Sequence, residues 1–231
     1  MAERPRAKLY VIPGSHAART GMLLLDHKGI DYRLVTLPTG FQRTLRLRGF
    51  PGGTVPALVV DGRRVQTNLA MARALDEVQP EPPLLPADPE RRRAVEEVEH
   101  WVDEELQMVA RRLVLAAALD WPGTLVDHGD DGRMGPLLWR RRWARRLGVR
   151  LPQRIFRVDR AAERELLDRL PALLDRVDEW VEAGAIGGEE LTAADYAVAS
   201  NVALLTYRGD LHEELRARPV MALVDRVLPA P

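Results

Sequence analysis

The chain has 231 residues, of which 46% are hydrophobic and 29% charged, and its 34 Lys and Arg are balanced by 34 Asp and Glu. A formal net charge of zero provides no overall attraction for nucleic acid or for an acidic partner, so we predict no nucleic-acid binding. The lack of cysteine excludes disulfide bonds, a cysteine nucleophile and thiolate metal sites. His100, His128 and His212 are dispersed along the chain, and no metal site is predicted.

The N-terminal residues include no apolar segment long enough for a signal peptide before the first strand-like run. No run approaches the roughly 20 apolar residues that span a bilayer. We therefore expect a cytoplasmic globular protein with no membrane span.

The first third of the chain alternates strand-like and helix-like runs. Apolar, β-rich runs bounded by turn residues predict strands at 8–12, 31–37, 56–60 and 63–66. Helical spacing of apolar residues, glycine stops and strong helix formers predict helices at 15–29, 41–49 and 68–78. The order β-α-β-α-β-β-α indicates an α/β domain, which we place at residues 1–80.

The segment "QPEPPLLPADPE" has five prolines in twelve residues and cannot continue a helix, so we predict a proline-rich linker at 81–89. The remaining residues, 90–231, predict an all-helical domain. A long helix is expected at 89–119, and Pro171 should kink or divide another helix at 159–184. The predicted fold class is therefore α/β + all-α, one domain of each kind.

Residues 133–158 contain nine arginines and no acidic residue, and Trp139, Trp143 and Leu147 recur every four positions. This pattern predicts an amphipathic basic helix. Such a helix is suited to recruiting an anionic acceptor or to lying on a membrane surface. A solvated helix, balanced by the aspartates within 127–131, is the interpretation that we favour.

Pro56 opens the apolar run of "GGTVPALVVDG" although it has no N–H to donate to a sheet. Such a proline belongs at the first residue of a strand, at an edge or at a bulge. Strand entry alone would explain Pro56. The alternative is a cis peptide bond, which turns the chain sharply and presents the backbone of Val55 to a ligand.

The element order, the "VPAL" before the hairpin and the helical second part together resemble the glutathione transferase superfamily, whose first domain is thioredoxin-like. The segments "LYVIPGSHAARTGMLLLDHKGIDYRLVTL", "TVPALVVDG" and "ALDEVQPEPPLLPADP" carry the resemblance. It implies that the Val55–Pro56 bond is cis and that Val55 pairs with an extended thiol peptide like a short added strand. It also implies a homodimer, glutathione as cosubstrate and no tightly bound cofactor.

Ser15 opens the first helix in "PGSHAAR", at the position that the resemblance assigns to the family's serine or cysteine. A hydroxyl there can donate to a substrate thiolate, and the helix N-terminus adds positive potential. Serine is equally a common N-cap, which would make its role structural only. His16 and Arg19 can add positive charge, although His16 can also be a solvent-facing helix residue. No base is evident that would make Ser15 a hydrolytic nucleophile.

The helix that opens with "QTNLAM" should hold the γ-glutamyl end of the thiol peptide. By resemblance, Thr67 stands where the family has an acidic residue or glutamine, and Asn68 where it has serine. Asn68 can cap the helix and bind a carboxylate, whereas Thr67 offers no charge for an ammonium group; Gln66 substitutes if the alignment shifts by one residue. Arg43 is a candidate for the glycyl carboxylate, or else a solvated arginine. Weak glutathione binding, another thiol and no thiol all stay open.

The second substrate is expected between the domains, against the long helix. Met108, Arg112 and Leu115 are spaced to share a face of that helix, and Trp121 lies near its end. A stripe of this kind is more often core than pocket. These four residues are therefore candidates for the second-substrate pocket, with core packing as the alternative.

A second motif in the helical part concerns folding. In "LTAADYAVA", Thr192 and Asp195 have the spacing of a capping box, and Leu191 and Tyr196 that of a hydrophobic staple. The segment also matches a folding motif of the family's helical domain. It predicts a helix start and no catalytic role.

These patterns predict a glutathione transferase-like enzyme. It would conjugate or transfer a low-molecular-weight thiol, in the first place glutathione, to a hydrophobic electrophile. The alternative is a non-catalytic binding or scaffold protein of the same fold with weak or no glutathione affinity. The residues Thr67 and Asn68 and the lack of cysteine favour that alternative, and no pattern identifies the electrophile.

Overall fold

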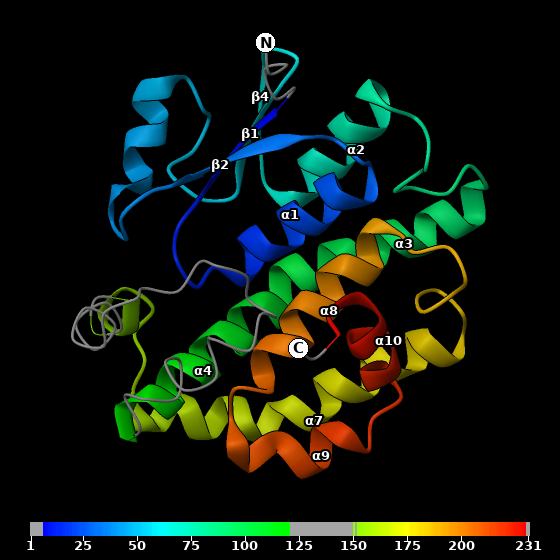
Figure 1. Ribbon diagram of the computed structural model, residues 1–231. Helices are drawn as coiled ribbons and strands as arrows, with labels where there is room; N and C mark the ends of the chain where they lie inside the picture. The colour runs from blue at the N-terminus through cyan, green and yellow to red at the C-terminus, as the bar shows by residue number, and fades with distance from the viewer. Residues whose placement is uncertain (1–6, 121–149, 151, 230–231) are drawn as a thin grey trace.

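The computed structural model describes residues 7–120, 150 and 152–229. A four-stranded sheet lies at one end of the molecule, and the helices α1 (His16–His27) and α2 (Asn68–Val78) separate it from the longer helices of the second part (Figure 1). The predicted pocket residue Trp121 and most of the arginine-rich segment lie outside the described residues.

The first part has the order expected from the sequence. Strand β2 is parallel to β1, β3 is antiparallel to β1 and to β4, and the sheet order is β2-β1-β3-β4. The parallel pair needs a crossover connection, which α1 provides, whereas the Asp61–Gly62 turn joins the antiparallel pair. The predicted α/β order is confirmed. Besides α1 and α2, the elements of this first part are β1 (Ala7–Val11), β2 (Tyr32–Thr36), the 3-10 helix η1 (Phe41–Arg48), β3 (Ala57–Val60) and β4 (Arg63–Gln66).

Both faces of the sheet are covered. Leu9 and Leu58 belong to the large core shared with α1, α2 and the second part. On the opposite face, Leu45 of η1 and Phe50 pack with Ala57 in a smaller cluster. Because successive side chains of a strand point to opposite faces, burial on both sides explains why the sequence from Ala57 onward is apolar without alternation.

The second part is helical in its described residues. The segments α3, η2 and α4 follow one another without a break, so the long helix expected at 89–119 is present. No helix among the described residues is long and apolar enough to cross a membrane. The elements are α3 (Pro89–Trp101), the π-helical η2 (Val102–Leu106), α4 (Gln107–Asp120), α7 (Arg160–Glu182), α8 (Ala193–Leu205), the 3-10 turn η4 (Gly209–Leu211), α9 (His212–Arg216) and α10 (Val220–Val227).

Pro171 does not divide its helix, so of the two expected outcomes, a kink or a division, the division is wrong. Helix α7 is continuous from Arg160 to Glu182, with Pro171 exposed on its surface. The proline ring deprives the helix of one backbone hydrogen bond. The turns on either side are held by Leu170 and Leu174, which are buried in the core.

Helix α8 is the centre of the second part, with all of its residues buried. Asp195 holds its first turn: Oδ2 accepts from the backbone N–H and the hydroxyl of Thr192, both at 2.7 Å, and Oδ1 accepts from Gly187 N at 2.6 Å. The predicted capping box is confirmed. The Tyr196 hydroxyl lies 2.8 Å from His27 Nδ1, which connects α8 to the end of α1.

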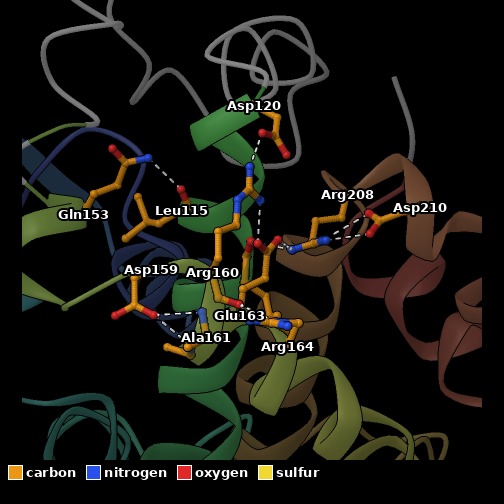
Figure 2. Close-up of polar contacts among 12 residues, drawn as sticks. Leu115, Asp120, Gln153, Asp159, Arg160, Ala161, Glu163, Arg164, Arg208 and Asp210 are labelled. Atoms are coloured by element: carbon orange, nitrogen blue, oxygen red, sulfur yellow. Dashed lines mark hydrogen bonds and ion pairs between the residues drawn. The ribbon is translucent and has the colours of Figure 1, made fainter.

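A buried ion pair joins α4, α7 and the segment after α8 (Figure 2). Arg208 donates to Glu163 Oε1 at 2.8 Å, and its other nitrogens pair with Asp210 at 2.5 and 3.0 Å. Glu163 also accepts from Arg160 at 2.6 Å, and Arg160 reaches Asp120 at the end of α4. The side chains of Arg208 and Glu163 are 6% and 8% exposed, so loss of either partner would leave an uncompensated buried charge.

The proline-rich linker is held in place by Lys28. Its Nζ lies 2.7, 3.2 and 2.5 Å from the carbonyl oxygens of Gln79, Pro80 and Pro82, and 2.5 Å from Asp76 Oδ1. The Lys28 side chain is fully buried. An ammonium group has three donors and no acceptor, so linker carbonyls and one carboxylate satisfy it completely.

Asp76 extends this contact to the second part. Its two oxygens accept from the backbone N–H groups of Leu84 at 2.9 Å and Leu85 at 3.0 Å. The carbonyl of Leu84 in turn accepts from the N–H of Ala193, the first residue of α8, at 2.9 Å. Hydrogen bonds thus connect α1, the linker and α8 in one chain.

A second ion pair crosses from α2 to α3. Arg73 donates to Glu99 at 2.8 Å, and Glu96 lies 3.5 Å from the same guanidinium. Glu99 is 4% exposed. Burial raises the pKa of Glu99 to about 7, because the attraction of Arg73 offsets only part of the cost of desolvating the carboxylate.

Replacing Lys28 by Met should lower the free energy of unfolding by about 3–5 kcal/mol, because Asp76 and the carbonyls of Gln79, Pro80 and Pro82 lose their donor. Lys8, the other lysine of the chain, is exposed on β1, and Lys8→Met should change the same quantity by no more than about 0.5 kcal/mol. Urea unfolding followed by circular dichroism measures both. Equal effects of the two substitutions would contradict the assignment of Lys28 as the anchor of the linker.

The raised pKa of Glu99 makes stability depend on pH. The folded chain binds this proton more tightly than the unfolded chain, so the contribution of Glu99 is largest below its ordinary pKa of 4.5 and is lost as the pH rises through about 7. Glu99→Gln cannot ionise but still accepts from Arg73. Relative to the unmodified chain, this variant should gain on the order of 2 kcal/mol between pH 5 and pH 8.

Urea unfolding at the two pH values measures that gain. Glu97→Gln, an exposed change on the same helix, is the control and should show no comparable gain between pH 5 and pH 8. A pH dependence that is the same in Glu99→Gln and in the unmodified chain would disprove the role of Glu99.

Candidate functional site

Ser15 lies at the N-terminus of α1, directly after β1 and the following turn. Its Oγ accepts a hydrogen bond from Ala18 N at 3.2 Å, which makes Ser15 the N-cap of α1. The residue is partly exposed. Because a hydroxyl can accept one hydrogen bond and donate another, the cap leaves the Ser15 proton available to a ligand. The roles of cap and thiolate donor are therefore compatible.

The peptide bond between Val55 and Pro56 is cis. Pro56 is buried, whereas Val55 is partly exposed. The strand ladder begins only at Ala57, opposite Tyr10 of β1. No hydrogen bond to the backbone of Val55 occurs among those of the described residues, so its N–H and C=O are placed to pair with an extended ligand.

Helix α1, the cis proline and the start of α2 meet around Gly21. A Cβ added to Gly21 would lie 3.3 Å from Pro56 Cβ and 3.4 Å from Asn68 Oδ1. Asn68 also donates through Nδ2 to the carbonyl of Ala17 at 3.0 Å. Since Ala17 is two residues from Ser15, the N-termini of α1 and α2 lie side by side. The structure thus brings together Ser15, Pro56 and Asn68.

The N-cap of α2 is Thr67, and the expectation that Asn68 caps this helix is wrong. Thr67 Oγ1 accepts from Ala70 N at 3.3 Å. Its φ of +74° lies in a region that β-branched residues rarely adopt, and such strain is typical of functional sites. The amide of Asn68 is used against α1 instead. The anion-binding groups left at this end are the N–H groups of Asn68 and Leu69, which have no acceptor within the helix.

Gln66 positions the loop before the cis proline. Its Oε1 accepts from Gly52 N at 2.6 Å, and its Nε2 donates to the carbonyls of Gly52 at 3.1 Å and Thr54 at 2.7 Å. The residue is buried. Both ends of the amide are therefore occupied by the loop that leads to Val55.

Arg43 lies on the outer side of the same loop. It belongs to η1 and is exposed. A Cβ added to Gly53 would lie 3.0 Å from Arg43 Cα, so η1 packs directly on the loop that precedes Val55. The location of Arg43 is consistent with contact to the far end of an extended peptide at Val55.

The residues expected to hold the second substrate differ in exposure. Met108 is 39% exposed on α4, whereas Leu115 is 8% exposed. Arg112 donates to the carbonyl of Arg157 at 3.3 Å. Figure 2 shows a second contact, in which Gln153 donates to the carbonyl of Leu115 at 2.8 Å. The segment around residues 153–157 therefore packs on this face of α4. Leu115 is core, and Met108 and Arg112 are accessible in part.

His16 faces α4 and is only 2% exposed, so the alternative of a solvent-facing residue is wrong. Burial and the nearby charge of Arg111 lower the pKa of His16 well below its ordinary value, although the Gln107 carbonyl acts in the opposite direction. His16 is therefore neutral at pH 7 and adds no positive charge near Ser15. The positive charge that acts on the imidazole is that of Arg111 on α4, a residue beside the helix face that the sequence pattern indicated.

This arrangement suits two negative groups at separate points. The first turn of α1 contains no acidic residue, and the Ser15 hydroxyl adds a donor to its positive end. The N-terminus of α2 forms a second anion-binding element beside it. Among the described residues, no three His, Asp or Glu side chains are grouped so that they could hold a metal ion.

Residues 14–78 match the family model described as "Glutathione S-transferase, N-terminal domain". The chain is 38% identical over 90 residues to glutathione S-transferase Z2 of Arabidopsis thaliana and 34% identical over 98 residues to maleylacetoacetate isomerase of Mus musculus. These alignments cover 38% and 40% of this chain and 40% and 45% of the two relatives. The match thus spans less than half the length of each curated relative.

A solved structure extends the similarity to nearly the whole chain. The glutathione S-transferase from Rhodospirillum rubrum F11 has a TM-score of 0.63 and 26% sequence identity, covering 95% of this chain and 87% of that one. This structural match includes the helical second part, which the family model does not reach. Together with the N-terminal match and the curated relatives, it makes the chain similar to glutathione transferases over nearly its whole length.

Proposed function

We propose that this chain is a glutathione transferase-like enzyme that transfers glutathione to an electrophilic carbon of a largely hydrophobic second substrate. The observation that carries the proposal is the juxtaposition of the Ser15 hydroxyl, the N-terminus of α2 and the backbone of Val55, which is unpaired within the described part of the chain. Each of these groups is suited to a different part of one extended thiol peptide. The names of the curated relatives, a glutathione S-transferase and an isomerase, agree with an enzyme of this superfamily.

Val55 would bind the middle of the peptide. Its N–H and C=O lie just before β3, where the pairing with β1 and β4 has not yet begun, so a peptide backbone can pair with them as a short added strand. Gln66 fixes the loop in which Val55 lies, which lowers the entropy lost on binding. The γ-glutamyl carboxylate would then lie on the N–H groups at the start of α2, where Thr67 offers a hydroxyl and no charge.

Ser15 would activate the thiol. Donation of its hydroxyl proton to the sulfur, together with the positive end of α1, stabilises the thiolate over the thiol. Each unit by which the thiol pKa falls corresponds to about 1.4 kcal/mol, which is within the range of one hydrogen bond to a charged group. The released thiol proton passes to solvent. The sulfur forms a bond to carbon while a leaving group departs with its electron pair, or while the resulting carbanion takes up a proton.

The alternative of a non-catalytic binding protein makes a different prediction about the thiol. It requires that glutathione bind weakly or not at all, in keeping with the lack of an acidic side chain at Thr67. Calorimetric titration of the folded chain with glutathione separates the two hypotheses. The same preparation, examined by sedimentation velocity, tests the predicted homodimer.

We expect saturable binding of glutathione to the unmodified chain and binding at least threefold weaker in Asn68→Ala. Loss of the Asn68 amide releases the first turn of α2 from Ala17 and disturbs the carboxylate site. Glu77→Ala, an exposed change at the other end of α2, is the control and should bind normally. A folded chain that gives no heat with glutathione would rule out the proposed transferase.

Substitutions of Ser15 separate its two roles. Ser15→Asp keeps a good N-cap but has no proton to donate, whereas Ser15→Ala loses both functions. Both variants should raise the pKa of bound glutathione by about one unit or more and lower kcat/KM about tenfold at pH 7. Only Ser15→Ala should also lose about 1 kcal/mol of stability.

The thiolate absorbance of bound glutathione, titrated against pH, measures this shift directly. Removing the donor destabilises the thiolate, so the rise of activity with pH should move to higher pH in both variants. Unaltered thiol titration in Ser15→Asp would show that Ser15 is a helix cap and nothing more.

A further inference from the structure

The 3-10 helix η1 presents an apolar row of side chains to solvent. Phe41, Thr44 and Leu47 recur at every third position, and such positions lie above one another on one face of a 3-10 helix. Within this row, the Thr44 hydroxyl donates to the carbonyl of Phe41 at 2.7 Å. Phe41 is 59% exposed, and Leu47, at 89%, is more exposed than the other large apolar side chains of the described residues.

The exposure of this row is fixed by the opposite side of the same helix. Leu45 is fully buried, and it packs with Phe50 and Ala57 against the outer face of the sheet. In Figure 1, η1 (light blue) lies on the side of the sheet that faces away from α1 and α2. Because Leu45 points inward, the row that contains Phe41 and Leu47 must point outward.

Arginines flank the apolar row. Arg43 and Arg46 are three positions apart and form the neighbouring row, and Arg48 ends the helix; all three are exposed. Within the described part of the chain, no carboxylate forms an ion pair with them. Arg64 of β4 adds a further cation at the end of η1, where its Nε donates to the carbonyl of Arg48 at 2.8 Å.

The positive charge of this region is not balanced locally, although the whole chain has a formal net charge of zero. Residues 32–60 contain four arginines and no aspartate or glutamate. Elsewhere on the surface, several exposed arginines lie beside carboxylates. Examples are the pairs of Arg63 with Glu77, Arg169 with Glu105 and Arg176 with Glu97. Helix η1 therefore combines outward apolar side chains with a local excess of positive charge.

We propose that η1 docks on an anionic membrane surface. Phe41 and Leu47 would enter the boundary between headgroups and acyl chains, and Arg46 and Arg48 would bind lipid phosphate and carboxylate groups beside them. Apolar side chains next to arginines are the composition that holds a helix in the plane of a membrane interface. Anionic lipids attract such cations, and a guanidinium matches the oxygens of a phosphate group.

The shape of the row favours a lipid surface over an acidic protein segment. Phe41 and Leu47 are two helical turns apart, and each projects into water between charged neighbours. A protein partner would need a separate fitted pocket for each of these anchors. A fluid lipid layer adapts its shape to each side chain and provides negative charge all round it.

Docking through η1 would bring the cleft close to the membrane. A Cβ added to Gly53 would lie 3.0 Å from Arg43 Cα, so η1 packs on the loop that leads to Val55. Hydrophobic electrophiles collect in a bilayer, and a docked chain would meet them there. This consequence rests on the proposed function, whereas the docking itself does not.

Cosedimentation of the full chain with lipid vesicles, in the absence of glutathione, tests the proposal. We expect binding to vesicles made of equal amounts of phosphatidylcholine and phosphatidylserine, and little binding to phosphatidylcholine alone. Added sodium chloride should release the chain, because salt screens the attraction of the arginines. Equal binding to the two kinds of vesicle, or binding to neither, would overturn the proposal.

Two substitutions and their matched controls locate the surface. Leu47→Ser should weaken binding to the anionic vesicles about tenfold, and Arg46→Gln about fivefold. Leu119→Ser changes an exposed leucine of α4, and Arg93→Gln an exposed arginine of α3; both controls should bind like the unmodified chain. If the controls weaken binding as much as the substitutions in η1, another surface is responsible and the proposal fails.

Other occupants of this surface give different results. A second copy of the chain on η1 predicts that Leu47→Ser shifts a dimer to a monomer in sedimentation velocity. An acidic protein segment predicts that soluble polyglutamate binds the unmodified chain and binds Leu47→Ser more weakly. Earlier thermal unfolding of Leu47→Ser would show that Leu47 is a packing residue. Each of these three results would overturn membrane docking.

The docking and the transferase activity fail in distinguishable ways. Vesicle binding through Leu47 and Arg46 without any binding of glutathione keeps the docking surface and rejects the transferase. Glutathione binding in a chain that ignores anionic vesicles rejects the docking surface and leaves the proposed function intact.

Discussion

The buried ammonium group of Lys28 is the contact on which the relation between the two parts of the chain depends. A buried positive charge must be surrounded by hydrogen-bond acceptors. A proline-rich segment offers many of them, because its extended backbone leaves carbonyl groups without partners in the same segment. The linker therefore folds onto the end of α1. Asp76 compensates the charge and also accepts a hydrogen bond from the backbone N–H of Leu84. The carbonyl of Leu84 in turn accepts from the first residue of α8.

This anchor has a consequence at the opposite end of α1. With Lys28 and His27 attaching its C-terminus to the linker and to α8, the helix has little freedom to rotate or slide. Its first turn must then lie against α4, where His16 is shielded from water and meets Arg111. The chemistry proposed for Ser15 thus depends on contacts made three helical turns away, as expected for a site that rigid elements hold in place.

Features encoded by local sequence were predictable, and features that depend on contacts across the fold were not. The strand and helix order, the capping box of Asp195 and the location of Ser15 follow from residues that are neighbours in the sequence. Nothing local shows that Lys28 is buried, or that Gln66 uses its amide on a loop fourteen residues away. The burial of His16 against α4 was unpredictable for the same reason, because helical spacing defines the faces of α4 but not which of them meets α1.

The electrostatics of the interface between α1 and α4 also explain why it contains one cation and not two. A protonated His16 beside Arg111 would place two like charges in a poorly solvated position, and burial prevents this by keeping the imidazole neutral. Burial also lowers the pKa of Arg111, because the charged guanidinium is poorly solvated at this position. At the neighbouring start of α2, the backbone of Thr67 adopts a strained conformation, and such strain is typical of functional sites.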